Sequence, residues 1–202
     1  MELERTEAQL SLGREAGRKA LHLSTAVVPV FYAMGLAKTA VVELLGSAAV
    51  LALVIEIWRR SSSRAREIFE HTGGMLLRGH EHESLTGATW LVVSCLAVVL
   101  LLPRPAAIAT LWCAAAGDPA ATLAGRSYRA ARGPLDGYGK SAIGSAGCLL
   151  ISFFGAWKLA HFSFSGATMI AAAATLAERA PGPIDDNVRV SVAAGAVAWL
   201  LS

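Results

Sequence analysis

The chain carries little charge for its length. Only 16% of its 202 residues are Asp, Glu, Lys or Arg, 54% are hydrophobic, and the mean hydropathy is +0.51. A soluble domain of this size does not need so much apolar material to build its core. The composition therefore argues against an ordinary soluble protein and predicts an integral membrane protein.

Cysteine is scarce as well. The three cysteines, Cys95, Cys113 and Cys148, all lie inside apolar runs, so neither a disulfide framework nor a zinc site is indicated. The net charge is +3, but the basic residues form no stripe of the kind that binds nucleic acid. The charged N-terminus, Met1 to Lys19, has no apolar core followed by a cleavage site, so we expect no removable signal peptide.

Apolar runs recur along the rest of the chain and predict an all-α protein with about seven transmembrane helices. They cover roughly residues 20–37, 39–58, 86–102, 105–123, 142–160, 162–178 and 188–201. Several are shorter than the ~20 residues that a free helix needs to cross a bilayer, so we expect tilting or polar extensions. Polar loops are expected at 59–85, 124–141 and 179–187. We interpret residues 1–202 as one membrane domain, with 1–18 as a cytoplasmic segment.

Basic residues are distributed unevenly between the two predicted sides of the membrane. If the helices alternate in direction, 15 of the 18 Lys and Arg residues fall on the side of the N-terminus. Only Lys38, Arg104 and Lys158 fall on the other side. By the positive-inside rule, the N-terminus and every long loop are cytoplasmic, and a cell (inner) membrane is the expected location.

Four acidic residues lie within or at the ends of the apolar runs, where an ionised carboxylate is costly and is usually paired or functional. They are Glu43, Glu56, Asp118 and Glu178. Glu56 precedes Arg59 and Arg60 by one helical turn, so an ion pair competes with a catalytic role. Glu43 is expected to be structural or to face the bundle. Small residues surround Asp118; helix packing explains those neighbours but not the acid.

A glycine-rich basic stretch follows Asp118. The glycines Gly125, Gly133, Gly137 and Gly139 would let backbone N–H groups face phosphate oxygens, and Lys140 would add a point charge. The stretch is not a Walker A motif, because no glycine stands five residues before Gly139.

Five sequence blocks resemble those of the dolichol kinase, phytol kinase and CTP-dependent diacylglycerol kinase family. In chain order they are Arg18-Lys19-Ala20-Leu21-His22, Leu85-Thr86-Gly87-Ala88-Thr89-Trp90, Gly117-Asp118-Pro119-Ala120-Ala121 with Gly125-Arg126, Lys140-Ser141 with Gly144-Ser145, and Asp185-Asp186-Asn187. The resemblance spans about residues 14–201. It implies an all-helical membrane enzyme that phosphorylates a lipid alcohol, with CTP as the common donor and a relation to phosphatidate cytidylyltransferases. The resemblance alone, and not spacing, makes Thr86 and Gly87 candidates.

Phosphoryl transfer requires positioning, neutralisation of the triphosphate charge and a carboxylate near the acceptor hydroxyl, and Mg²⁺ prefers oxygen ligands. The predicted site follows from these needs and from the resemblance. The candidates are Asp118 and Lys140 as catalytic residues; Gly125, Arg126, Ser141, Gly144 and Ser145 at the nucleotide phosphates; Asp118, Asp185, Asp186 and Asn187 as Mg²⁺ ligands; and Lys19, His22, Glu56, Thr86, Gly87 and Glu178 as further members. Helix capping by Asp186 and Asn187 is the alternative to metal binding.

The chain departs from the family pattern at two positions. Ile143 stands where the family's lysine block has glutamate, and Arg129 stands where a glycine is usual. Three functions therefore stay open: a lipid-alcohol kinase acting on an isoprenoid alcohol or diacylglycerol, a cytidylyltransferase acting on a lipid phosphate, and a non-catalytic lipid-binding or transport protein. In all three the expected partners include the bilayer and no nucleic acid. The sequence also fits an active enzyme in which a residue elsewhere in the chain supplies the acid that is missing at position 143.

Overall fold

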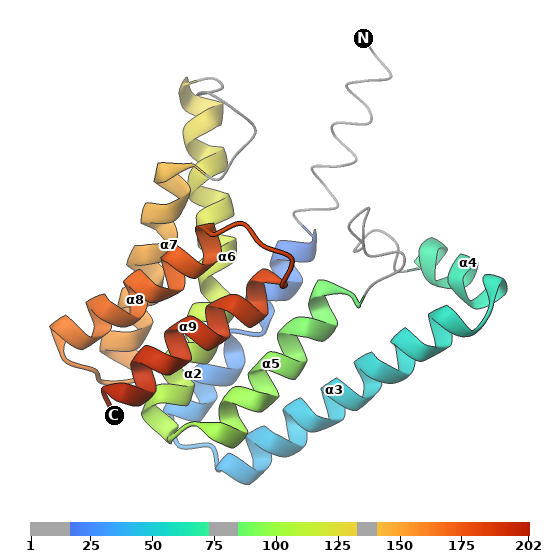
Figure 1. Ribbon diagram of the computed structural model, residues 1–202, viewed down its shortest axis with the longest axis horizontal. Helices are drawn as coiled ribbons and strands as arrows, with labels where there is room; N and C mark the ends of the chain where they lie inside the picture. The colour runs from blue at the N-terminus through green and yellow to red at the C-terminus, as the bar shows by residue number, and fades with distance from the viewer. Residues whose placement is uncertain (1–16, 73–84, 133–140) are drawn as a thin grey trace.

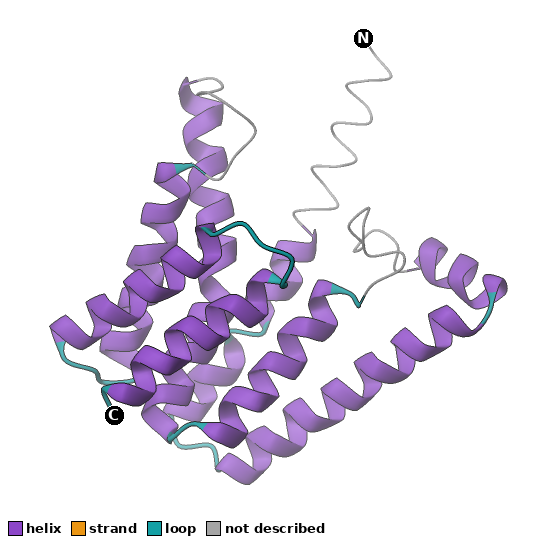
Figure 2. Cartoon of the chain, in the orientation of Figure 1, coloured by secondary structure: helices purple, strands orange, loops and turns teal. Residues whose placement is uncertain are grey.

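The computed structural model describes residues 17–72, 85–132 and 141–202, and within these ranges every regular element is helical (Figure 2). The all-α prediction is confirmed. Residues 17–24 form a helix, and the further elements are α2 (Val27–Ala33), α3 (Lys38–Ser61), α4 (Ser63–Thr72), α5 (Gly87–Leu101), α6 (Arg104–Arg132), α7 (Ala142–Phe154), the π-helix η3 (Gly155–Leu159), α8 (Phe164–Arg179) and α9 (Asp186–Leu200).

All seven apolar runs fall on helical segments; the run at 20–37 falls on the helix of residues 17–24 and on α2, and the run at 142–160 falls on α7 and η3. In the described part of the chain, two helical segments are long and apolar enough to cross a membrane, Lys38–Ser61 and Ala142–Leu159. Gly87–Leu101 is a shorter apolar helix. Helices α5, α7, α8 and α9 each begin after an N-cap residue whose side-chain oxygen accepts a backbone hydrogen bond. Thr86 accepts from Thr89 N, Ser141 from Gly144 N, Ser163 from Gly166 N and Asp185 from Asn187 N.

Consecutive long helices run in alternating directions around α6, which packs against α2, α5, α7, α8 and α9 (Figure 1). At one end of the bundle, Arg104 donates to Tyr32 O at 2.5 Å and Lys38 donates to Leu100 O at 3.3 Å. The opposite end, called the polar end below, holds the start of the helix formed by residues 17–24, the ends of α3, α6 and α8, and the starts of α5, α7 and α9.

Two of the predicted loops are partly wrong. Residues 63–72, assigned to the loop 59–85, form α4, and residues 124–132, assigned to the loop 124–141, continue α6 to Arg132. Ala and Arg dominate residues 124–132 and are strong helix formers, and no proline interrupts them. The start of α4 is capped by Ser62, whose hydroxyl accepts from Ala65 N at 3.1 Å. Both stretches are polar helices, which an apolar-run criterion does not detect.

Helices α6 and α7 approach each other closely because small residues line their contact. A Cβ added at Gly144 would lie 2.8 Å from Ala121 O, and one at Gly147 would lie 2.8 Å from the Ala124 Cβ. Small residues permit this kind of backbone approach in helix pairs. The small-residue explanation of the neighbours of Asp118 is therefore confirmed, and it leaves the carboxylate itself to be explained.

Candidate functional site

Asp118 lies on α6 at the polar end and faces two residues from the helix formed by residues 17–24. Lys19 Nζ forms an ion pair with Asp118 Oδ2, and His22 Nδ1 lies 3.8 Å from the same oxygen. The other ring nitrogen of His22, Nε2, is 2.8 Å from Ala114 O, one turn earlier on α6. Lys19 and His22 are three residues apart and so share one helical face. Three predicted site residues from distant parts of the chain thus come together.

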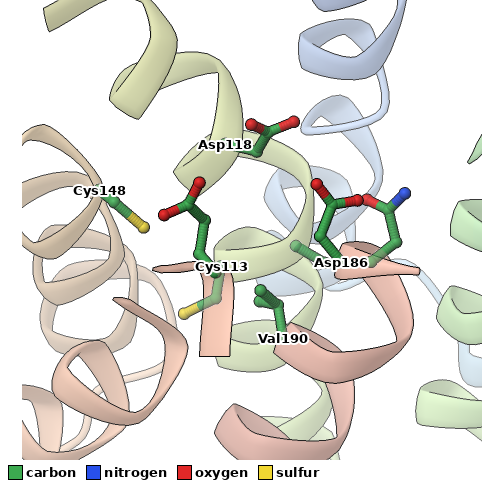
Figure 3. A pocket seen from close by; sticks show the side chains of 8 residues that line it. Cys113, Asp118, Cys148, Asp186 and Val190 are labelled. Atoms are coloured by element: carbon green, nitrogen blue, oxygen red, sulfur yellow. The ribbon is translucent and has the colours of Figure 1, made fainter. Parts of the chain in front are cut away.

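A pocket opens beside Asp118 where α6, α7, α8 and α9 meet. Asp118, Glu178, Asp186 and Asn187 supply its polar lining, and Cys113, Ala114, Cys148 and Val190 supply its apolar lining. In Figure 3, Asp118 lies above Cys113 and Val190, with Asp186 on the neighbouring helix. The cavity volume is about 10 Å³, close to the smallest space that holds one water molecule. The site therefore joins acidic groups to a small, partly apolar recess.

Glu178 is the best buried of the pocket acids, with 3% of its surface exposed. It comes from the last turn of α8, whereas Ile143 lies on the outer surface of α7, 41% exposed, and does not line the pocket. The pocket therefore receives no acid from position 143, and α8 contributes Glu178 to it. Glu43, by contrast, is exposed on α3, so the expectation that it faces the bundle is wrong.

The aspartates at the start of α9 have separate roles. Asp185 is the N-cap: its Oδ1 accepts from Asn187 N at 2.9 Å and from Asn187 Nδ2 at 2.8 Å. Capping was expected of Asp186 and Asn187 instead; Asp185 takes this role because a cap side chain reaches the N–H two residues later. Asp186 lies in the first turn and lines the pocket.

The four predicted Mg²⁺ ligands do not form a preassembled metal site. Within the described ranges, no three His, Cys, Asp or Glu side chains are placed so that they could hold a metal ion together. Asp118 and Asp186 share the pocket, while the Asp185 carboxylate is engaged by Asn187. Mg²⁺ commonly uses one or two carboxylates with phosphate oxygens and water. The residues present fit a cation that arrives with a phosphate donor.

A second buried polar cluster lies between α3 and α5. Glu56 Oε2 accepts from Arg59 Nε at 2.7 Å and lies 2.6 Å from Arg59 Nη2. Its Oε1 accepts from Thr86 N at 2.7 Å and from Thr89 Oγ1 at 3.1 Å. The ion-pair interpretation of Glu56 is confirmed, and the same carboxylate attaches the start of α5 to α3. Glu56 does not line the pocket.

Asn187 connects the two polar regions. Its Nδ2 donates to Gly87 O at 3.2 Å, at the first residue of α5, as well as to Asp185. Thr86 caps α5, with its side chain accepting from Thr89 N at 3.3 Å. Thr86 and Gly87 therefore support the site from α5 without lining the pocket. No local sequence pattern indicates this bridge, because it joins residues that are 100 positions apart.

The predicted phosphate-binding residues lie along the contact of α6 with α7. Gly125 and Arg126 are helical residues of α6 and not loop residues. Ser141 caps α7, and Ser145 Oγ accepts from Arg179 Nη1 at 3.1 Å. The close packing described above accounts for Gly144. Lys140 lies outside the described residues.

Sequence reasoning missed the apolar part of the pocket, Cys113, Ala114, Cys148 and Val190. A helical spacing offered a signal, because Ala114 precedes Asp118 by four residues and so shares its face. Nothing in the sequence indicated that Cys148 and Val190 meet that face. Searches of protein-family models, curated proteins and solved structures found no match for this chain.

Proposed function

We propose that the protein is a membrane lipid-alcohol kinase, which transfers the γ-phosphate of a nucleoside triphosphate, CTP by the resemblance, to the hydroxyl of an isoprenoid alcohol or diacylglycerol. The observation that carries the proposal is the grouping of Asp118, Glu178 and Asp186 around one recess, with Lys19 on Asp118. Acidic groups beside a cation meet the needs of phosphoryl transfer, which are positioning and charge neutralisation.

The proposed membrane arrangement has seven spans with the polar end in the cytoplasm. Helices α5 and α9 have 15 residues each and α8 has 16, which correspond to about 22–24 Å of helix. The hydrocarbon core of a bilayer is about 30 Å thick, so local thinning accompanies this fold. Asp118 lies about 21 Å along α6 from Arg104, level with the polar ends of those shorter helices. The recess is then at the depth of lipid hydroxyl groups.

In the proposed reaction the lipid oxygen attacks the γ-phosphorus, the bond to the bridging oxygen breaks, and the nucleoside diphosphate leaves. Asp118 takes the hydroxyl proton or binds Mg²⁺, and Asp186 is the second carboxylate available to the ion. When bound, Mg²⁺ neutralises charge on the phosphate oxygens. The Lys19 ammonium is beside Asp118 and is available to the incoming phosphate.

Product analysis tests the proposal. Purified protein in nanodiscs is incubated with a lipid alcohol, Mg²⁺ and CTP labelled in turn at the α- and γ-phosphate. A kinase yields γ-labelled lipid and CDP. In a parallel incubation with a lipid phosphate, transfer of the α-labelled cytidylyl group to the lipid, with release of pyrophosphate from CTP, would establish a cytidylyltransferase instead. The absence of both products would favour the non-catalytic alternative.

Asp118→Asn tests the assigned residue. The amide preserves shape but removes the charge needed for a proton or Mg²⁺, so turnover should fall by roughly 10²–10⁴-fold, while the yield of folded protein stays unchanged. Glu43→Gln is the matched control, because it neutralises an exposed acid on α3, and it should retain full turnover. Near-normal activity of Asp118→Asn would exclude Asp118 from the chemistry. A changed Mg²⁺ dependence in any residual activity would favour the metal role over the base role.

A further inference from the structure

The recess beside Asp118 has room for the hydroxyl end of a lipid and not for its chain. Its cavity volume is about 10 Å³, the scale of a single water molecule. The acids meet an apolar lining of Cys113, Ala114, Cys148 and Val190. This lining could be the mouth of a chain-binding tunnel or its closed floor, and the packing around it distinguishes these two arrangements.

Toward α7 the floor is closed by direct contact between small residues. A Cβ added at Gly117 would lie 3.1 Å from Cys148 Sγ, and one at Gly147 would lie 2.9 Å from Ala120 O. Carbon atoms in contact are about 3.5–4.0 Å apart, so a hydrocarbon chain between two helices needs about twice that separation. Helices α6 and α7 leave no such space.

Toward α8 and α9 the floor is closed in the same way. Helices α8 and α9 bury mainly small residues in the bundle: Ala167, Ala171, Ala174, Ala194 and Ala198 have 0% exposure, and Ile170 is equally buried. Alanine side chains cannot swing aside to open a channel, because they have no rotatable heavy-atom torsion. A chain could enter this region only if whole helices separated.

The outer surface of the bundle has the opposite character. Large apolar side chains are exposed on helices that contribute residues to the site, including Leu21 at 55%, Leu123 at 59% and Leu176 at 69%. A lipid chain that stays in the bilayer can lie along this surface while its hydroxyl reaches Asp118. Such a chain loses nothing by remaining outside, because lipid tails are as apolar as the protein surface.

We propose that the site selects an unhindered primary alcohol at the membrane surface and does not measure chain length. This inference rests on the proposed kinase function. Only the hydroxyl group enters the recess between Asp118, Glu178 and Asp186; the carbinol carbon lies at its mouth, and the isoprenoid chain stays in the bilayer. Whether an alcohol is a substrate then depends on the substitution of its carbinol carbon. Short and long isoprenoid alcohols are phosphorylated at similar rates.

The test compares farnesol, geranylgeraniol and undecaprenol at equal mole fraction in nanodiscs containing the full-length protein, with γ-labelled CTP and Mg²⁺. A pocket that encloses a chain discriminates a single methylene by roughly 10-fold or more. We expect kcat/KM values within about threefold across the series, well below that figure. A length cut-off, or a tenfold difference between farnesol and geranylgeraniol, would overturn the inference.

Two matched comparisons complete the experiment. Nerolidol has the same fifteen carbons as farnesol but a tertiary hydroxyl, and it should not be phosphorylated; equal use of both would contradict a narrow recess. Val190→Ala enlarges the floor and should leave the relative rates of the three primary alcohols unchanged, whereas a selective gain for one length would show that chains reach the floor. No labelled lipid from any alcohol would instead overturn the proposed function, and the inference with it.

Discussion

Gly144→Ala should separate α6 from α7 and displace Asp118. The added Cβ would lie 2.8 Å from Ala121 O, whereas ordinary contacts begin at 3.4 Å. Helix α6 would therefore have to recede by about 0.6 Å, since a backbone oxygen cannot rotate away as a flexible side chain can. Ala121 follows Asp118 by three residues, so the movement is transmitted to the carboxylate within one turn.

The expected magnitudes follow from this geometry. Overpacking costs roughly 1–3 kcal/mol, offset in part by the gain of about 1 kcal/mol when alanine replaces glycine in a helix. At roughly 2–4 °C per kcal/mol for a chain of this size, the melting temperature should fall by a few degrees. Since misplacement of reacting groups by about 1 Å costs about 10²-fold, a shift of this size should lower turnover by roughly tenfold or more.

The chain provides its own reporter of unfolding and its own control. Cys95, Cys113 and Cys148 are all buried and free, so a thiol-reactive fluorescent dye signals their exposure on heating. Gly46→Ala is the control, because a Cβ at Gly46 on α3 has nothing within 4 Å; it should be neutral or slightly stabilising and fully active. Gly144→Ala with unchanged melting temperature and turnover would refute the close contact of α6 with α7.

Two further substitutions test the polar clusters. Glu56→Gln removes the Glu56 carboxylate from its ion pair with the buried Arg59 guanidinium, 2% exposed, and breaking a buried pair should destabilise the protein by about 3–5 kcal/mol. The double variant Glu56→Gln with Arg59→Met should recover much of this loss in the same dye assay. A single variant as stable as the unmodified protein would contradict the prediction. Lys19→Met removes the cation paired with Asp118. If Asp118 binds Mg²⁺ as proposed, this substitution should lower the half-saturating Mg²⁺ concentration roughly tenfold, although turnover falls. Lys38→Met, at the opposite end of the bundle, is the control and should change neither turnover nor the half-saturating Mg²⁺ concentration. A higher half-saturating Mg²⁺ concentration in Lys19→Met would argue against competition between Lys19 and Mg²⁺ for Asp118.

Apolar runs were sufficient to locate most of the helices. The run predicted at 142–160 matches Ala142–Leu159, and the run at 162–178 matches Phe164–Arg179. The polar helices at 63–72 and 124–132 were missed, because α4 and the end of α6 carry no apolar run to mark them. Helix formation there depends on propensity and capping, which leave a weaker pattern.

Two pocket-lining residues could be predicted because each is an acidic residue in an otherwise apolar stretch. Asp118 and Glu178 are acids within apolar runs, and such positions are usually functional or paired; both line the pocket. The cap of α9 was assigned to the wrong residues, because adjacent polar residues look alike in sequence; the cap is Asp185, not Asp186 or Asn187. The predicted metal role of these aspartates stays a prediction.

The sequence alone determined that the chain is helical, where its apolar helices lie and which acids stand out, because each of these depends on neighbouring residues. Only the tertiary structure decided which residues meet: Lys19 with Asp118, Glu178 with Cys148, and Asn187 with Gly87. It also showed that the recess is shallow, because its size depends on how closely α6 and α7 approach. That distance is set by glycine and alanine contacts between separate segments, which no local pattern records.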